Sequence, residues 1–294
     1  MLANNNEAII NKLAKNSVKT NKKQYAILFF TIILSAFMLF CVFTIGMTYL
    51  NSSRLQNTRL NGAEYDIVTM NGFTSEQLNT LQQNENIRSV GIESYAGFIQ
   101  STEYDKTVEI GLLWCDEVFW DNLMSPARTK LDGHYPQNKN ELMVTKDILK
   151  TCGNENLSVG DSLILTYENN TGVYTDEFVI SGIWDGYGDT SAGFVSKAFY
   201  DETGYDLKNN GILCIKLNCN YVFPTTIQSI EKSLDFSDRQ IFAPTGYIEN
   251  SFKLLLGICG LALVICLSAY LLIYNILYLS VSGKIRYYGL LQSL

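Results

Sequence analysis

The stretch Leu254–Leu294, LLLGICGLALVICLSAYLLIYNILYLSVSGKIRYYGLLQSL, decides how the chain is organised. No residue in Leu254–Gly283 carries a charge. About 20 apolar residues in a helix already cross a hydrocarbon core of about 30 Å. The stretch therefore predicts a transmembrane helix over 253–283 that ends at Lys284 and Arg286.

A second span lies near the start of the chain. The run Tyr25–Leu50, YAILFFTIILSAFMLFCVFTIGMTYL, is uncharged. It is longer than the apolar part of a signal peptide, about 7–15 residues, and no A-x-A-like site follows it, so we predict an uncleaved transmembrane helix over 25–50. Lysines precede this span, and Lys284 and Arg286 follow the other one. Because Lys and Arg near span ends stay inside, both termini are predicted to be cytoplasmic in the cell membrane.

Residues 1–24 are basic and carry Lys12, Lys15, Lys19, Lys22 and Lys23. Apolar residues recur between these lysines at helical spacing. The pattern predicts an amphipathic helix on the inner membrane face, with a disordered basic tail as the alternative.

Residues 51–252 differ from both ends in charge. They hold 28 acidic and 14 basic residues, whereas the whole chain has a net charge of −7. A basic, apolar, acidic, apolar, basic order predicts one extracytoplasmic domain held between two spans. An acidic domain disfavours nucleic-acid partners, because phosphate binding needs clustered Lys and Arg.

Seven cysteines divide between the two kinds of region. The spans hold three of them, which are small apolar residues there. The four in the domain are even in number and lie in a compartment that permits disulfides, with three possible pairings left open. They are Cys115, Cys152, Cys214 and Cys219. Metal binding is disfavoured, because the sequence has no CxxC and a single histidine, His134, in a predicted surface turn.

The start and the end of the domain predict an α/β unit. Residues 64–70 and 87–100 have strand character, and the segment 74–84 between them opens with the helix-capping pattern TSEQ. A strand over 211–217 and a helix over 224–234 supply the second half. Together they predict a split βαβ, ferredoxin-like unit in an α+β membrane protein.

The middle of the domain predicts a β-rich insert. Strands are expected at 108–114, 142–144, 162–167 and 177–183, with a short helix or turn at 116–124, a turn at Gly133 and Pro136, and a polar loop over 168–175. A helix is expected over 194–203.

In this insert and in the last span the chain resembles the MacB-like and FtsX-like permeases of ABC transporters. The extracytoplasmic match is to a G-x-x-P…E-hydrophobic-V, GD and F-x-I-x-G-I pattern, and the last-span match is to an ending of the form G-L-L-x-S-L-G after a basic turn. The matching residues are Gly133, Pro136, Glu141, Leu142, Val144, Val159, Gly160, Asp161, Phe178, Ile180, Gly182, Ile183, Tyr274, Asn275, Ile276, Ile285, Arg286, Gly289, Leu290, Leu291, Ser293 and Leu294.

The resemblance implies a permease subunit with no enzymatic activity of its own. ATP would be bound and hydrolysed by a separate cytoplasmic ABC ATPase, and the second permease would be another copy or a homologous half. It implies that residues 284–294 begin the cytoplasmic coupling segment, with Lys284, Arg286, Gly289, Leu290 and Leu291 as candidate contacts to the ATPase. The family continues with further spans, so the chain is expected to be a first half or a fragment.

The motifs of the sequence agree with a permease subunit that leaves ATP hydrolysis to a separate protein. The sequence has no G-x-x-x-x-G-K-[ST] for a nucleotide and no H-E-x-x-H for zinc. No catalytic constellation supports the alternative of a membrane-anchored enzyme. Asn275 is a polar residue well inside the second span, and it predicts a helix–helix contact more than a substrate path.

One alternative from another functional class stays open. Two spans around an extracytoplasmic ligand-binding domain also describe a membrane sensor. The sequence does not identify the substrate, which could be a peptide, a lipoprotein or a lipid, and it does not separate export from mechanical signalling.

Overall fold

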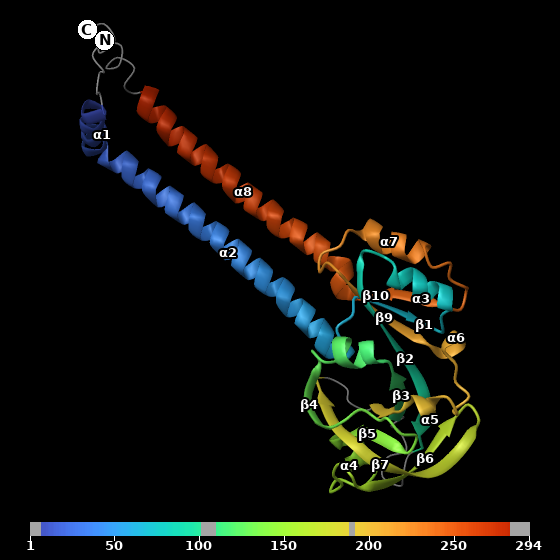
Figure 1. Cartoon of the computed structure of the whole chain (residues 1–294). Helices are drawn as coiled ribbons and strands as arrows, with labels where there is room; N and C mark the ends of the chain where they lie inside the picture. Colours follow the sequence, from blue (N-terminus) through green and yellow to red (C-terminus); the bar gives the residue numbers. More distant parts are fainter. Residues whose placement is uncertain (1–6, 101–109, 188–191, 283–294) are drawn as a thin grey trace. The chain divides into compact units, whose positions relative to one another are not determined.

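The computed structural model describes residues 7–100, 110–187 and 192–282. It divides into two compact units, one made of Met1–Leu50 with Lys253–Leu294 and the other of Asn51–Phe252. The second unit is called the domain below. Figure 1 shows the course of the chain through both units.

Two long helices, α2 (Lys22–Asn61) and α8 (Gly246–Ser282), are long and apolar enough to cross a membrane. In α2 none of the residues of the most apolar window is buried by protein, and in α8 only 6% are. Apolar side chains exposed all round a helix need a lipid environment rather than water. Helix α2 continues beyond Leu50, and α8 begins before 253, so both helices extend past the predicted spans into the domain's own residues.

The N-terminal helix α1 (Glu7–Thr20) corresponds to the predicted basic segment. It has Lys19 in its last turn, a favourable place for a cation because the carbonyl end of a helix is partly negative. Over Glu7–Thr20 the structure therefore contains the helical alternative.

The first and last elements of the domain form the predicted ferredoxin-like half. The strands β1 (Ile67–Met70) and β2 (Ile87–Ile99) are joined by α3 (Ser75–Gln82), and β9 (Ile212–Leu217) and β10 (Ile241–Pro244) are joined by α7 (Pro224–Lys232). The sheet order is β10-β1-β9-β2, with every neighbouring pair antiparallel. Each βαβ unit is thus split by a strand of the other, which confirms the predicted fold class.

Local sequence explains the start of α3. The Thr74 hydroxyl accepts a hydrogen bond from the Gln77 backbone N, and the Gln77 side chain accepts one from the Thr74 backbone N. This capping box satisfies two helix N–H groups that would otherwise lack a partner.

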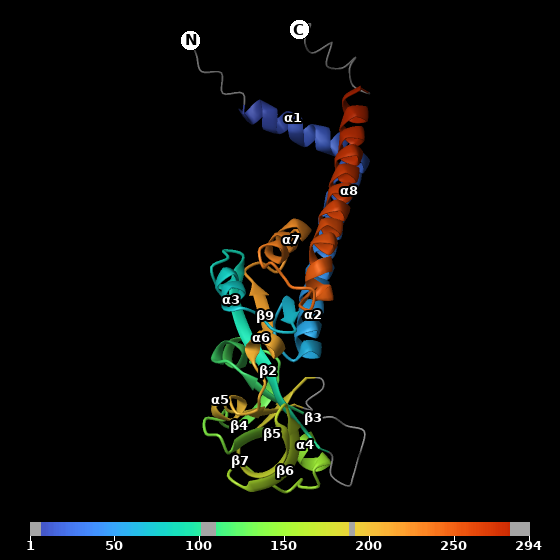
Figure 2. The ribbon, with the colours of Figure 1, turned by 90° about the vertical axis from the view of Figure 1, so that its right-hand side faces the viewer.

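The insert contributes six strands and closes on itself. It contains β3 (Ile110–Cys115), β4 (Arg128–Gly133), β5 (Glu141–Thr145), β6 (Ser162–Asn169), β7 (Gly172–Gly186) and β8 (Ala192–Val195). The pairings run from β2 through β3, β8, β5, β7 and β6 back to β2, with β4 added on β7. Figure 2 shows these strands at the end of the domain away from α3 and α7.

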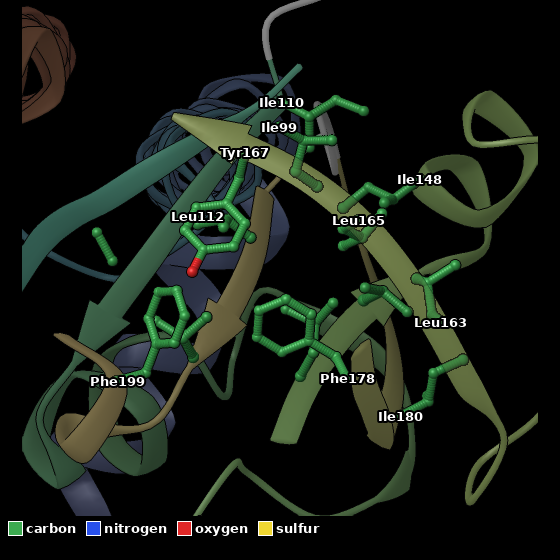
Figure 3. Packing of buried hydrophobic residues seen from close by; sticks show 14 of the residues in the cluster. Ile99, Ile110, Leu112, Ile148, Leu163, Leu165, Tyr167, Phe178, Ile180 and Phe199 are labelled. Atoms are coloured by element: carbon green, nitrogen blue, oxygen red, sulfur yellow. The ribbon is translucent and has the colours of Figure 1, made fainter. Parts of the chain in front are cut away.

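Three groups of buried apolar residues form the core of the domain. One fills the closed ring of strands and includes Leu112, Leu165 and Phe178 (Figure 3). A second packs α3 and α7 on the ferredoxin-like sheet through Leu81, Ile230 and their neighbours. The third lies on the opposite face of the same strands, where Val68, Leu113 and Cys214 alternate with residues of the other two groups. Because β2 takes part in both halves, pairing with β9 near its start and with β3 and β6 near its end, it joins them rigidly.

Several predictions for the insert were wrong in detail. The helix expected over 194–203 is the strand β8 followed by a single turn, α5 (Lys197–Tyr200), because Ser196 caps the helix there by accepting from the Phe199 backbone N. The polar loop expected over 168–175 is mostly strand, since β6 and β7 pair up to Asn169↔Gly172. Residues 116–124 contain a π-helical turn, Val118–Leu123.

Four short elements were not predicted, namely β4, α4 (Lys146–Thr151), α6 (Leu207–Asn210) and β10. Strand β4 is exposed along most of its length and lies at one edge of the sheet, so it lacks the alternation of apolar and polar residues that marks a half-buried strand.

Several insert residues that carry the sequence resemblance make structural contacts between strands or within turns. Gly133 and Gly182 are cross-strand partners on β4 and β7. Glu141 accepts hydrogen bonds from the backbone N atoms of Gln137 and Asn138, at 2.7 and 3.1 Å. Asp161 accepts one from Ser158 N at 2.8 Å. These side chains fix chain turns and are all committed to structural contacts.

Candidate functional site

Two buried charged side chains, Asp66 and Lys216, and two more exposed ones, Arg54 and Glu64, lie beside the residues where the chain enters and leaves the domain. The Lys216 side chain on β9 is 6% exposed, and its Nζ lies 3.2 Å from Glu64 Oε1 and 3.2 Å from Asp66 Oδ2. Asp66 Oδ2 also accepts a hydrogen bond from Leu217 N at 2.9 Å. Arg54 approaches Glu64 at 3.8 Å. The four charged residues Arg54, Glu64, Asp66 and Lys216 are called the junction cluster below.

The charges of the junction cluster depend on one another. Moving an ion out of water is expensive, and the cost is recovered only when opposite charge and hydrogen bonds surround it. Burial raises the pKa of the Asp66 carboxyl, and the Lys216 ammonium and the Leu217 N–H oppose that rise. The cluster therefore holds the chain segment before β1 against β9. Removing either the Lys216 ammonium or the Asp66 carboxylate would leave a buried charge without its partner and would strongly destabilise the domain.

Backbone hydrogen bonds connect the same place to the segment before α8. The carbonyl of Asp66 accepts from Thr245 N at 2.8 Å, and Thr245 directly precedes α8. The strands β1 and β10 pair from Ile67↔Pro244 to Met70↔Ile241. Since α2 leads into β1 and α8 follows β10, the two long helices are attached to neighbouring strands at one edge of the sheet.

A cleft of about 440 Å³ opens beside the junction cluster. Glu64 and Lys216 line it together with Arg88 and Asp121. Its lining is mixed in charge and offers no set of groups aimed at one ligand.

A second cleft, of about 570 Å³, has aromatic walls. Trp114, Trp120 and Tyr135 line it, and the two indole rings belong to residues that are 8% and 7% exposed. Its charged lining residues are three acids and one lysine: Asp116, Glu117, Asp121 and Lys197. The cleft suits a ligand that has an apolar surface and a positive group.

Several contacts hold the walls of this aromatic cleft in place. The Tyr135 hydroxyl donates to the carbonyl oxygens of Cys115 and Val195, both at 3.2 Å, and accepts from Cys115 N at 3.0 Å. The ring of Trp120 lies 5.0 Å from that of Tyr135 and carries the Arg128 guanidinium 4.0 Å from its centroid. These walls are preformed, so a ligand would not need to order them.

Glu93 on β2 is enclosed near the aromatic cleft, with Cys115 as its cross-strand neighbour on β3. Desolvation raises the pKa of Glu93 from its ordinary value of 4.5 to about 7. Burial is the largest cause that raises the pKa of Tyr65, Cys115 and Cys214, and the negative charge of an ionised Glu93 raises these pKa values further. None of the hydrogen bonds found among residues 7–100, 110–187 and 192–282 involves its carboxyl group.

We expect Glu93→Gln to stabilise the domain at high pH and to have little effect at low pH. The folded-state pKa is raised, so the folded protein binds more protons than the unfolded chain between pH 4.5 and about 7, and stability falls as pH rises through that range. The loss above pH 7 is of order 3 kcal/mol, and glutamine would remove it. Thermal unfolding at pH 4.5 and pH 8 checks this, with the exposed Glu177→Gln as control. A gain of the same size at both pH values would contradict the assignment.

The residues predicted to contact the ATPase cannot be placed. Lys284, Arg286, Gly289, Leu290 and Leu291 lie outside the described residues, so their role stays a prediction. Asn275 is on α8 and is exposed in this chain, where it is open to contact from another helix.

Gly46 is a glycine of the apolar helices that sequence reasoning did not single out. A Cβ added at Gly46 on α2 would lie 2.7 Å from side-chain atoms of Ile258 on α8. At Gly257 and Gly260 a Cβ would meet nothing within 4 Å. Close approach of the two helices therefore depends on Gly46, and the glycine spacing in α8 has no such role in this chain.

All seven cysteines are free. Cys115 on β3 and Cys214 on β9 are both buried, but β2 lies between these strands. Two strand spacings come to about 9.5 Å, which exceeds the Cα separation of about 7 Å that a disulfide can bridge. None of the three pairings of Cys115, Cys152, Cys214 and Cys219 is formed. No cluster of metal-ligating residues is found in the parts of the chain that the structure describes. His134 is exposed, as predicted for a surface turn.

The sequence carried a signal for the junction cluster that was not used. Lys216 is the single charged residue in the apolar run GILCIKL, and a lone charge in a buried strand needs a partner. Its partners lie about 150 residues earlier, directly after α2. Only the fold brings them together.

Comparisons with known proteins give likenesses at the level of structure alone. No family model matches the chain, and no curated protein sequence matches it. The periplasmic region of MacB from Actinobacillus actinomycetemcomitans is similar with a TM-score of 0.42 and 13% identity, over 66% of this chain and 95% of that chain. The extracellular domain of the noncanonic ABC-type transporter YknZ from Gram-positive bacteria has a TM-score of 0.39 and 12% identity, over 61% of this chain and 98% of that chain.

A domain of a permease protein from Porphyromonas gingivalis is also similar, with a TM-score of 0.36 and 9% identity, over 62% of this chain and 89% of that chain. The two helices that are long and apolar enough to cross a membrane lie on either side of the domain in the sequence. The three similar domains come from MacB, the transporter YknZ and a permease protein, and each likeness has a sequence identity of 13% or less.

Proposed function

We propose that the chain is the permease subunit of an ABC transporter and that it passes motion from a separate cytoplasmic ATPase to the domain outside the membrane. The observation that carries the proposal is the attachment of both long helices to neighbouring strands. Helix α2 leads into β1, α8 follows β10, and these strands pair directly. A movement of α2 relative to α8 would therefore act directly on β1 and β10, the two paired strands at this edge of the sheet.

The residues between the apolar helices and the closed ring of strands suit such a transmission of motion. The segment Gly246–Ser282 contains no proline, so it has none of the breaks that proline introduces into a helix. The junction cluster then fixes the entry segment to β9, next to the long strand β2. Strand β2 continues into the closed ring of the insert, so displacement at the membrane end would reach the ring through continuous backbone.

The proposed topology has both termini in the cytoplasm. The lysines of α1 and the basic residues Lys284 and Arg286 support this, because positive charge near span ends stays on the inner side. ATP would be bound by the partner, since the sequence holds no phosphate-binding loop. A second copy of this chain or a homologous half would complete the transporter.

We expect the paired substitution Leu290→Asp with Leu291→Asp to remove the ATPase from the purified complex. Apolar residues that dock on a partner lose that contact when they become charged. The measurement is affinity purification of the full chain from its native cells, followed by an ATPase assay and identification of bound proteins. Ile164→Asp, at an exposed position of β6, is the matched control and should keep the partner. Equal recovery of a nucleotide-binding protein with both variants would contradict the coupling assignment.

A membrane sensor is the second candidate function. The aromatic cleft with its three acidic residues favours it, because a preformed cleft in an extracytoplasmic domain is what a ligand sensor needs. The same cleft would serve a permease as a place where substrate is first held. Co-purification separates the two functions, since a sensor would bring down a kinase or cyclase and a permease an ABC ATPase.

A further inference from the structure

An aromatic pair, made of the exposed Phe223 and the half-buried Phe252, lies at the surface of the domain. Phe223 is 60% exposed, although it is a large apolar residue. Its ring centroid lies 4.3 Å from that of Phe252, with the planes tilted by 44°. Phe223 directly precedes Pro224, the first residue of α7, whose far side is anchored in the core by Ile227 and Ile230.

The position of Phe252 along the chain sets its depth. Phe252 lies two residues before Leu254, where the uncharged run to Gly283 begins. Both residues belong to the single helix α8, so they are separated by about 3 Å along its axis. Phe252 is therefore at the boundary between the apolar run and the domain, and Phe223, which contacts it, is at the same level.

This level of a membrane favours aromatic rings. Tyrosine and tryptophan are enriched near span ends, and phenylalanine on the apolar face of an interfacial segment is buried at the boundary between headgroups and acyl chains. The same ring exposed to water keeps the cost of apolar hydration. Tyr221 lies in the same short loop as Phe223, and Lys253 follows Phe252. A lysine at this place extends its ammonium group toward the headgroup phosphates.

We propose that Phe223 and Phe252 form an interfacial anchor that inserts into the headgroup region of the bilayer on the domain side. The anchor fastens the loop before α7 to the membrane at the depth where α8 enters it. The ferredoxin-like half then contacts lipid, whereas the half that contains the closed ring of strands stays free to move. The inference depends on α8 crossing the membrane and is independent of the ATPase partner.

The test uses the full chain reconstituted into liposomes of phosphatidylcholine and phosphatidylglycerol, with tryptophan as the probe. Phe223→Trp adds an indole at the anchor, and Ile164→Trp adds one at an exposed position of the ring half. Leu263→Trp, inside the apolar run, is the positive control for the span. The native Trp114, Trp120 and Trp184 are each less than 10% exposed and give the same background in every variant.

We expect lipids with bromine close to the headgroup to quench most of the emission added by Phe223→Trp and almost none of that added by Ile164→Trp. Lipids with bromine near the bilayer centre should quench Leu263→Trp most. If Leu263→Trp is quenched but Phe223→Trp behaves like Ile164→Trp, the anchor does not exist. Equal quenching of Phe223→Trp and Ile164→Trp by aqueous acrylamide would overturn it in the same way. Absence of quenching at Leu263→Trp would overturn the span and the anchor together.

Discussion

Replacing Lys216 by methionine will lower the free energy of unfolding of the domain by about 3–5 kcal/mol. Methionine fills a similar volume but brings no charge, so Asp66, which is 1% exposed, loses its ammonium partner and keeps only the hydrogen bond from Leu217 N. An uncompensated buried carboxylate is among the few single-site changes that cost this much. The measurement is chemical denaturation of the full chain in detergent micelles, followed by tryptophan fluorescence, which reports on the domain because all three tryptophans lie there.

Two further variants separate the loss of the charge pair from the loss of packing. Asp66→Asn combined with Lys216→Met removes both charges and keeps an acceptor for Leu217 N, so it should recover a large part of the lost stability. Lys139→Met removes an exposed lysine whose ion pair with Glu202 has both side chains more than half exposed, and it should cost no more than about 1 kcal/mol. If Lys216→Met costs no more than Lys139→Met, the junction cluster does not hold the domain together.

The loss caused by Lys216→Met should also depend on pH. Without the ammonium, the pKa of Asp66 rises further above its ordinary value, because only burial and one hydrogen bond act on it. The folded variant then binds its proton at higher pH than the unfolded chain does. Its stability will be closest to that of the natural protein near pH 4 and will fall as pH increases through the raised pKa.

Local sequence predicted the ferredoxin-like half well because its elements begin and end with local signals. Thr74 and Gln77 mark the start of α3 within four residues, and Pro224 marks the first turn of α7. The strand over 211–217 is an apolar run bounded by polar residues. Each of these signals depends on neighbours in the chain and not on the rest of the fold.

The insert was predicted less well because its pairings are between distant segments. Strand β8 is only four residues long and is stabilised by β3 and β5, which lie far from it in sequence. The predicted helix therefore begins too early, at Phe194, because the helical pattern after Ser196 has no local signal that separates it from the strand. Closure of the ring through Phe98↔Glu168 likewise has no local signal.

The candidate site shows the same division. The acidic residues that follow α2 and the lysine in β9 were all visible in the sequence, but their contact was not. The predicted coupling residues, from Lys284 to Leu291, stay predictions.

We expect Gly133→Ala to be among the most damaging single-methyl additions in the domain, at about 3–5 kcal/mol. Gly133 has φ +88°, where alanine is strained by about 1–2 kcal/mol. An added Cβ would also lie 2.2 Å from the carbonyl oxygen of Ser181 and 2.8 Å from the Cα of Gly182. Those atoms belong to the backbone of β7, which also pairs with β5 and β6 and so cannot withdraw easily.

Gly160→Ala is the matched control for this prediction. Gly160 has φ +95°, yet a Cβ there would meet nothing within 4 Å. It carries the same conformational strain without the clash, so it should cost only about 1–2 kcal/mol. The difference between the two variants in chemical denaturation measures how tightly β4 is held on β7. Equal losses of stability in the two variants would mean that β4 and β7 separate freely at Gly133 and Gly182. Close backbone packing would then not explain why the sequence pattern has glycine at these two positions.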